Sequence, residues 1–480
     1  MDKTPAALRA HLAQVAAEIK HRKQQLLQLH HYEYAVHVEL NRVAKHSQPI
    51  LSLPTEITSE IFIQCLPDGK DAMPTANWLE APLLLASVCR AWCGIVMSTP
   101  ALWRAFWIDL DMMDDEELSM FMHLWLKNAC GNPVRMGLLG DFSSVDVPYL
   151  VALPQMFSKT LSSLAVVVQL SDVPQLRSLA LELEGLEELD VCIDKDDDPE
   201  GSLDLSGFLA TAPRLTKVSL NSIKPTELTL PWSRVTDFHL HHRFFTATHL
   251  FDILILLPNL VHADIDVDYE LDSPVPLVNV LDHQLTLPHL QSLSISEGMD
   301  AHPAQPHFLD LLTLPQLRKL EAKDASERLL DGLLKRSESP SLVRLQLSPV
   351  FDERILKRVF PGPSFTHLAE LDLRFISHPF AEALMTPLVD ESFLPELRSL
   401  RLEASDSNRC VSLGALVLLV GPAIVERHEK GRRLQSVEVV MSPRMWVTFV
   451  IPEEQLAPYR RLQGDGVEVV IGDTSGQSFI

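Results

Sequence analysis

Apolar side chains recur between residues 1 and 48 in alternating steps of four and three residues. The positions are Leu8, Leu12, Val15, Ile19, Leu26, Leu29, Val36, Leu40 and Val43. These steps give a period of about 3.5 residues, which is typical of coiled-coil helices. Arg22 and Glu33 occupy two positions of the same seam, where they weaken packing but can set a register. Residues 1–48 are therefore predicted to form a long amphipathic, coiled-coil-like helix.

Three roles are open for this predicted helix. The helix could pack on its own chain, associate with a second copy of itself, or bind a partner helix. The segment carries a net positive charge, whereas the rest of the chain is acidic. This change in charge places a domain boundary near Ser47 and Pro49.

Residues 51–110 have the pattern of a small helical unit. Pro54 suits the first turn of a helix, because the N–H that proline lacks would be unpaired there. A second helix is predicted from Ala81 to Val96, after a loop rich in Pro, Gly and Asp. A unit of this size holds more large apolar groups than it can bury. Part of its apolar surface is therefore expected to face a partner or a neighbouring domain.

Three motifs in this segment, in this order, resemble an F-box. They read L-P-x-E-I-x-x-x-I-F from Leu53, L-L-x-x-S-V-C-R-x-W from Leu83, and P-x-L-W from Pro100. The resemblance covers residues 53 to about 107 and is closest to the F-box proteins of mushroom-forming fungi. Those proteins also often carry a heptad-rich helix before the first motif. The loop before Leu83 is longer than in a minimal F-box, so the place of residues 68–80 in the unit stays open.

This resemblance implies docking on a Skp-type adaptor of a cullin–RING ubiquitin ligase. Such an interface would be a hydrophobic helix-in-groove contact with aromatic anchors. The matching adaptor-binding positions are Leu53, Pro54, Ile57, Ile61, Phe62, Val88, Cys89, Trp92, Leu102 and Trp103. The alternative for several of them, Trp92 especially, is that they hold the three helices together.

A phrase of the form Leu-x-x-Leu-x-Leu repeats through residues 111–440, clearly so from about residue 155. The first leucines of the later copies are Leu260, Leu290, Leu317, Leu342, Leu368 and Leu397. This phrase and spacing resemble the leucine-rich repeat. Each copy would place leucines on one face of a strand, and because one repeat cannot bury that face alone, copies must stack. Few copies carry the Asn or Cys of the regular repeat, so an irregular solenoid is expected.

Residues 441–480 are predicted to cap this stack with strands at Trp446–Ile451 and Val467–Ile471. The predicted fold class is therefore α/β. A long N-terminal helix precedes a three-helix F-box-like unit, and an irregular leucine-rich-repeat-like solenoid follows.

Composition narrows the function classes further. The 46% hydrophobic and 22% charged residues are ordinary for a folded protein. With 64 acidic against 41 basic residues, the net charge of −23 argues against a general nucleic-acid binder. No segment reaches the roughly 20 apolar residues of a membrane span. Six cysteines without C-x-x-C pairs, and no secretory signal at the start, favour the cytoplasm or nucleus.

The sequence offers little catalytic or metal chemistry. It lacks the phosphate-loop, dinucleotide, zinc-protease and serine-hydrolase motifs. His239, His241 and His242 would bind a metal only if they converged, and neighbouring strand residues point to opposite faces. Acidic residues alternate with apolar ones at Asp264, Asp266, Asp268, Glu270 and Asp272. They indicate either a solvated strand face or an acidic patch for a basic partner, and no metal or cofactor is expected.

These observations favour a non-enzymatic recognition protein. The expected function is the substrate-recognition subunit of an SCF-type ubiquitin ligase, with the F-box on a Skp-type adaptor and the repeats on a target protein. The alternative is a repeat scaffold, oligomerised through the N-terminal helix, with no ubiquitin role. An apolar stripe in residues 53–107 that is free of the repeats would favour the first. Recognition through a phosphate is also open, and the candidate basic residues are Arg318, Arg344, Arg398 and Arg401.

Overall fold

The chain folds into two compact units in a computed structural model. The first comprises Met1–Trp107 and His123–Asn132, and the second Ile108–Met122 and Pro133–Ile480. The structure describes residues 5–47, 53–67, 73–75, 77–113, 115–142, 152, 154–194, 204–245, 247–269, 284–297, 308–323, 325–405, 409–431, 434–441 and 451–474. Within these residues no helix has both the length and the apolar character needed to cross a bilayer.

The first unit is helical. Its elements are α1 (Pro5–Ser47), α2 (Thr55–Ile63), α3 (Leu83–Val88), α4 (Arg90–Met97), the 3₁₀ turn η2 (Pro100–Trp103) and the last residues of α5 (Asp115–Ala129). Its core contains Trp103 and Trp125, whose rings meet edge to face with centroids 4.7 Å apart. This contact explains why residues 123–132 belong to the helical unit, although the sequence places them in the repeat segment.

Between α3 and α4 the structure differs from the single predicted helix Ala81–Val96. Cys89 has extended backbone angles, φ −161° and ψ 165°, and separates the two short helices. The N–H of Cys93 then donates to the Cys89 carbonyl at 2.9 Å, which starts α4 afresh. The break lets α3 and α4 bury Leu83, Leu85 and Val96 from two separate axes.

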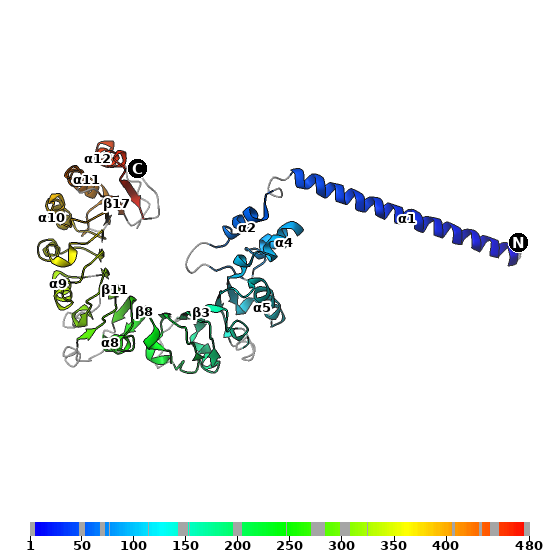
Figure 1. Cartoon of the computed structure of the whole chain (residues 1–480), viewed down its shortest axis with the longest axis horizontal. Helices are drawn as coiled ribbons and strands as arrows, with labels where there is room; N and C mark the ends of the chain where they lie inside the picture. Colours follow the sequence, from blue (N-terminus) through cyan, green and yellow to red (C-terminus); the bar gives the residue numbers. More distant parts are fainter. Residues whose placement is uncertain are drawn as a thin grey trace. The chain divides into compact units, whose positions relative to one another are not determined.

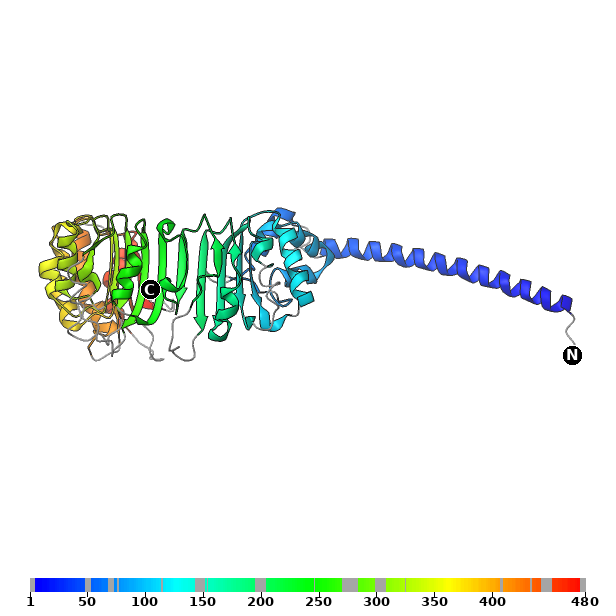
Figure 2. The same cartoon turned by 90° about the horizontal axis from the view of Figure 1, so that it is seen from below.

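The second unit contains a large parallel sheet, which confirms the α/β class. From β2 onward its order is β2-β3-β5-β7-β8-β9-β11-β13-β14-β15-β16-β17-β18. The strands are β2 (Val134–Leu139), β3 (Leu161–Gln169), β5 (Glu188–Asp194), β7 (Lys217–Asn221), β8 (Asp237–Phe245), β9 (His262–Tyr269), β11 (Ser292–Glu297), β13 (Lys319–Lys323), β14 (Arg344–Ser348), β15 (Glu370–Leu373), β16 (Ser399–Ala404), β17 (Ser436–Met441) and β18 (Glu468–Asp473). Figure 2 shows strands of this sheet side by side.

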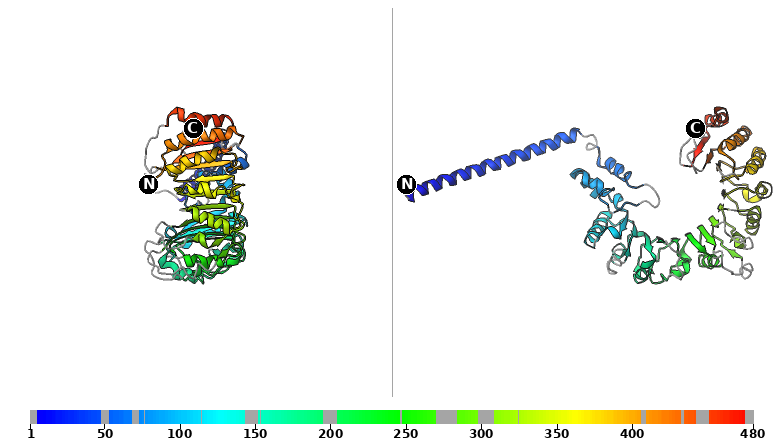
Figure 3. Two further views of the ribbon diagram at one scale, coloured as in Figure 1. Left: turned by 90° about the vertical axis from the view of Figure 1, so that its left-hand side faces the viewer. Right: turned by 180° about the vertical axis from the view of Figure 1, so that it is seen from behind.

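Helices cover the outer side of this sheet, and the strands line its inner side (Figures 1 and 3). The helices are α7 (Val173–Arg177), α8 (Ala247–Ile255), α9 (Glu327–Arg336), α10 (His378–Val389), α11 (Leu413–Glu429) and α12 (Glu453–Gly464). Short strands form two small sheets, β4 (Leu181–Glu182) with β6 (Leu209–Thr211) and β10 (Leu285–Thr286) with β12 (Leu312–Thr313), while β1 (Ala105–Asp109) crosses the boundary between the units. Ser326, Ser377 and Ser412 each accept a backbone N–H at the start of α9, α10 and α11, which explains where these helices begin.

Buried leucines from successive strands stand in register. Leu320, Leu345, Leu371 and Leu400 pair from β13 to β16, and all four are buried. Because side chains alternate across a strand, the residues beside them point to the inner side of the sheet. At the C-terminus β18 overlaps the predicted strand Val467–Ile471, whereas residues 446–450 of the other predicted strand lie outside the described residues.

Asp172, which follows β3, provides a prediction about stability. Its side chain is buried, and that burial, with the nearby Asp141 carboxylate, raises its pKa. An acid whose pKa is raised by folding contributes its full stability below the unfolded-state pKa of 3.8, where it is protonated in both states. This contribution to stability is lost as the pH rises through the pKa of the folded state. Asp172→Asn should therefore stabilise the chain at pH 7 by roughly 1 kcal/mol. Urea unfolding at pH 7 and pH 4 measures this, and a gain that does not shrink at pH 4 would contradict the assignment.

Candidate partner-binding surfaces

An apolar stripe runs along α2 at the surface of the first unit. Pro54 precedes the helix with φ −53° and ψ 147°, so that the helix begins at Thr55. Leu53, Ile57 and Ile61 follow at intervals of four residues and are exposed, Ile57 by 51%. Residues four apart lie on one face of a helix, so Ile57 and Ile61 form an apolar strip on α2. Leu53 precedes the helix and adds a further exposed apolar side chain. A strip of this kind on a folded unit marks a surface suited to a partner.

A second exposed strip lies on α3. Leu84 and Val88, again four residues apart, are 42% and 55% exposed. Cys89 and Trp92 are half-buried, and the Trp92 ring contacts Phe62 at a centroid distance of 4.8 Å. The α3 strip therefore ends at residues that connect the surface to the core.

Three of the predicted adaptor-binding residues lie inside the unit. Phe62, Leu102 and Trp103 are at most 1% exposed. The indole N–H of Trp103 donates to the Val96 carbonyl at 2.9 Å, so this side chain joins η2 to α4. These residues shape the unit but offer no surface for a partner. Of the ten predicted residues, the exposed ones are Leu53, Pro54, Ile57, Ile61 and Val88.

The loop before α3 adds apolar surface that the sequence motifs do not indicate. Trp78 and Leu79 are 61% and 77% exposed. Thr75 donates to the Glu80 carboxylate at 2.7 Å, and the Leu79 N–H donates to Asn77 Oδ1 at 2.9 Å. These bonds hold Trp78 and Leu79 on an ordered turn. An aromatic residue within a polar loop was the available sequence signal for this feature.

In the second unit, polar residues form rows across the inner side of the sheet. One row takes a single residue from each of successive strands, paired in register. It runs Asp190, Ser219, His239, Asp264, Ser294, Glu321, Gln346, Asp372, Arg401 and Glu438. A second row beside it runs Cys192, Asn221, His241, Asp266 and Ser296. The inner face is thus a polar surface laid over a leucine-rich core.

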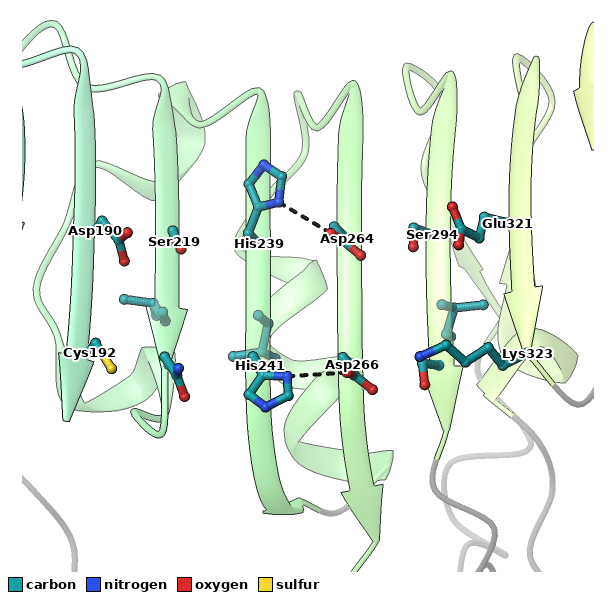
Figure 4. A pocket seen from close by; sticks show the side chains of 15 residues that line it. Asp190, Cys192, Ser219, His239, His241, Asp264, Asp266, Ser294, Glu321 and Lys323 are labelled. Carbon is teal, nitrogen blue, oxygen red and sulfur yellow. Dashed lines mark ion pairs between the residues drawn. The ribbon is translucent and has the colours of Figure 1, made fainter. Parts of the chain in front are cut away.

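A hollow of about 570 Å³ lies over these rows between β5 and β13 (Figure 4). Within it His239 Nδ1 lies 3.5 Å from Asp264 Oδ2, and His241 Nδ1 lies 3.2 Å from Asp266 Oδ2. The hydrogen bond from His239 is the main cause that lowers the pKa of Asp264. This lowered pKa favours the negatively charged form of Asp264 at the floor of the hollow.

The positions of these side chains bear on two predictions from the sequence, a metal site at the histidines and an acidic patch on β9. His239 and His241 point to the same side of β8, while the side chain of His242 lies outside the described residues. In the described part of the chain no group of three or more His, Cys, Asp or Glu side chains is arranged to hold a metal. Asp264 and Asp266 share the inner face. The side chains of the other predicted acidic residues, Asp268, Glu270 and Asp272, are not among those described.

Further along the sheet, acidic and basic groups of the inner face neutralise one another. Arg374 contacts Asp372 at 2.9 Å and lies 3.8 Å from Glu403, and Arg401 contacts Glu438 at 2.9 Å. Burial raises the pKa of Glu403, and the two arginines partly offset this effect. Among the arginines considered for a phosphate, Arg344 and Arg401 are thus already engaged, Arg344 with Glu370 at 3.2 Å. This arrangement does not favour phosphate recognition at these two positions.

Comparison with protein-family models finds no model that matches this chain, and comparison with curated proteins finds no match either.

Proposed function

We propose that this chain is the substrate-recognition subunit of an SCF-type ubiquitin ligase. Its F-box-like unit would dock on a Skp-type adaptor, and its repeats would hold a target protein. The chain would supply proximity and orientation, while other subunits carry out the transfer of ubiquitin. The exposed strip of Ile57 and Ile61 on α2, with the exposed Leu53 just before the helix, carries this proposal, because these residues lie within the F-box-like motif.

The burial pattern of the unit supports an adaptor contact through α2 and α3. Phe62, Leu102 and Trp103 fill the interior, which leaves Ile57 and Val88 at the surface with large exposed fractions. A helix that presents apolar residues at four-residue intervals suits a hydrophobic groove in a partner. The adaptor would bury these strips and would leave the tryptophan core unchanged.

For the second unit we propose an irregular leucine-rich-repeat-like solenoid, preceded in the chain by the long helix α1. The leucines paired in register from β13 to β16 support this assignment, since stacked repeats build a core of this kind. The target would bind the inner face. Asp190, Asp264, Asp266 and Glu321 outnumber Lys323 around the hollow, so a target segment with basic side chains would be favoured.

Binding to a purified fungal Skp-type adaptor tests the proposal by calorimetry. The full chain should bind, and Ile57→Asp should weaken binding by about 100-fold, because a charge would enter the centre of an apolar contact. Leu418→Asp is the matched control, since Leu418 is 56% exposed on α11 in the second unit. This control should bind like the unaltered chain.

Circular dichroism checks that both variants remain folded. A well-folded unaltered chain that does not bind the adaptor would reject the ligase proposal. The alternative, a repeat scaffold oligomerised through α1 with no ubiquitin role, would then be favoured. The exposed apolar side chains of α1 support this alternative.

A further inference from the structure

The helix α1 presents an apolar seam with no cover among the described residues. Val15, Ile19, Leu26, Leu29 and Val36 are 39% to 66% exposed. These five follow the steps of three, four and seven residues that place side chains on one side of a coiled-coil helix. A helix of 43 residues with such a seam gains most of its stability by packing the seam against something.

Two charged residues interrupt this seam. Arg22 and Glu33 stand at seam positions, and both side chains are largely exposed. Within the helix, Arg22 lies 3.9 Å from Glu18, and Glu33 lies 3.3 Å from His30. Exposed polar contacts of this kind contribute little to stability. The two charges therefore remain open to a stronger partner.

The seam is symmetric about the point midway between Leu27 and Gln28. A reversed copy centred on this point brings Arg22 opposite Glu33, since the two residues are equally distant from the centre. The same reversal brings Leu26 opposite Leu29 and Ile19 opposite Val36. Apolar residues then face apolar residues, and each cation in the seam faces an anion.

A parallel copy in register gives the opposite result. Arg22 would face Arg22 of the second copy, and Glu33 would face Glu33 of the second copy, with like charges inside the seam. Outside the seam, a parallel pair would instead gain a contact between opposite charges, because it would bring Glu18 near Lys23. Charges that flank a seam are solvated and count for less than charges within it.

We propose that α1 forms an antiparallel coiled coil with α1 of a second copy of this chain, in the register set by two reciprocal Arg22–Glu33 pairs. The occupant of the seam is thus the chain itself. This dimer does not depend on the adaptor contact, because its residues are separate from those of α2 and α3.

Sedimentation equilibrium of the full chain at micromolar concentrations tests the proposal. The unaltered chain should dimerise. Arg22→Glu should weaken the dimer by about tenfold or more, because two carboxylates would then face each other in each pair, and Glu33→Arg should act likewise through two cations. The double variant Arg22→Glu/Glu33→Arg should restore dimerisation, since it exchanges the charges and keeps the pairs.

Lys20→Glu is the matched control, because Lys20 is an exposed cation next to the seam but outside it. It should dimerise like the unaltered chain, and circular dichroism should show each variant folded. A monomeric unaltered chain would overturn the proposal. So would single variants that dimerise normally, which is the result of a parallel pair, or a double variant no better than the singles.

Discussion

Trp103→Ala is expected to destabilise the helical unit by about 3–5 kcal/mol, the usual cost of removing a large aromatic side chain from a core. Trp103 is fully buried, its ring packs on Trp125, and its indole N–H donates to the Val96 carbonyl. Alanine would leave a cavity, and the Val96 carbonyl would lose its partner from the indole. Both effects act on the contact between η2 and α4.

Hydrogen exchange of the peptides that cover residues 83–103 measures this loss within the full chain. Protection should fall in these peptides and should stay unchanged in β13 to β17 of the second unit. Trp78→Ala is the control, since Trp78 belongs to the same unit but is 61% exposed. If the two variants lost equal protection, Trp103 would not be the core residue described above.

Arg427→Met is expected to cost the second unit about 3–5 kcal/mol, because it leaves buried backbone carbonyls without their hydrogen-bond donor. Arg427 lies in α11 and is 1% exposed. Its guanidinium donates to the carbonyls of Leu388, Phe393 and Leu394 at 3.0, 3.0 and 2.6 Å. These carbonyls belong to the end of α10 and the chain that leaves it. Methionine would fill part of the volume but would leave three buried acceptors without this donor.

Chemical denaturation with tryptophan-independent detection, such as circular dichroism, measures the change. Arg427→Lys should recover only part of the loss, because one ammonium group cannot reach three carbonyls with the geometry of a guanidinium. Arg460→Met is the control: Arg460 is an exposed arginine of α12 that pairs with Glu453. A loss for Arg427→Met no larger than that of the control would contradict the role assigned to Arg427.

Local patterns in the sequence indicate the elements better than they indicate the contacts between them. The repeated leucines predict the strands of the sheet, because a strand with one buried face has apolar residues at every second position. The start of α2 is predicted by Pro54, because the proline ring fixes φ at about −65°, a value compatible with the first residues of a helix. The place of Ile57 and Ile61 on one face of α2 follows from their four-residue spacing alone.

Other features depend on residues that are distant in the chain. The division of the predicted helix at Cys89 comes from the need to pack α3 and α4 on one core, which no local pattern records. The burial of Trp103 depends on Trp125, and that of Arg427 on three carbonyls more than thirty residues earlier. The pairing of His239 with Asp264 requires the register of β8 against β9. Sequence spacing within one strand carries no information about that register.

On the inner face, the residues that form the surface are separate from the residues that form the core. On β9, Asp264 is exposed, and its neighbour Ile265 is fully buried. A substitution at Asp264 therefore alters the surface and leaves the packing of Ile265 in place. Such a change should cost little stability, because most large losses of stability come from changes in the core. Each strand adds one residue to a row, so the face can acquire a new preference by single steps. Between β5 and β13, the polar surface can therefore change largely independently of the core beneath it.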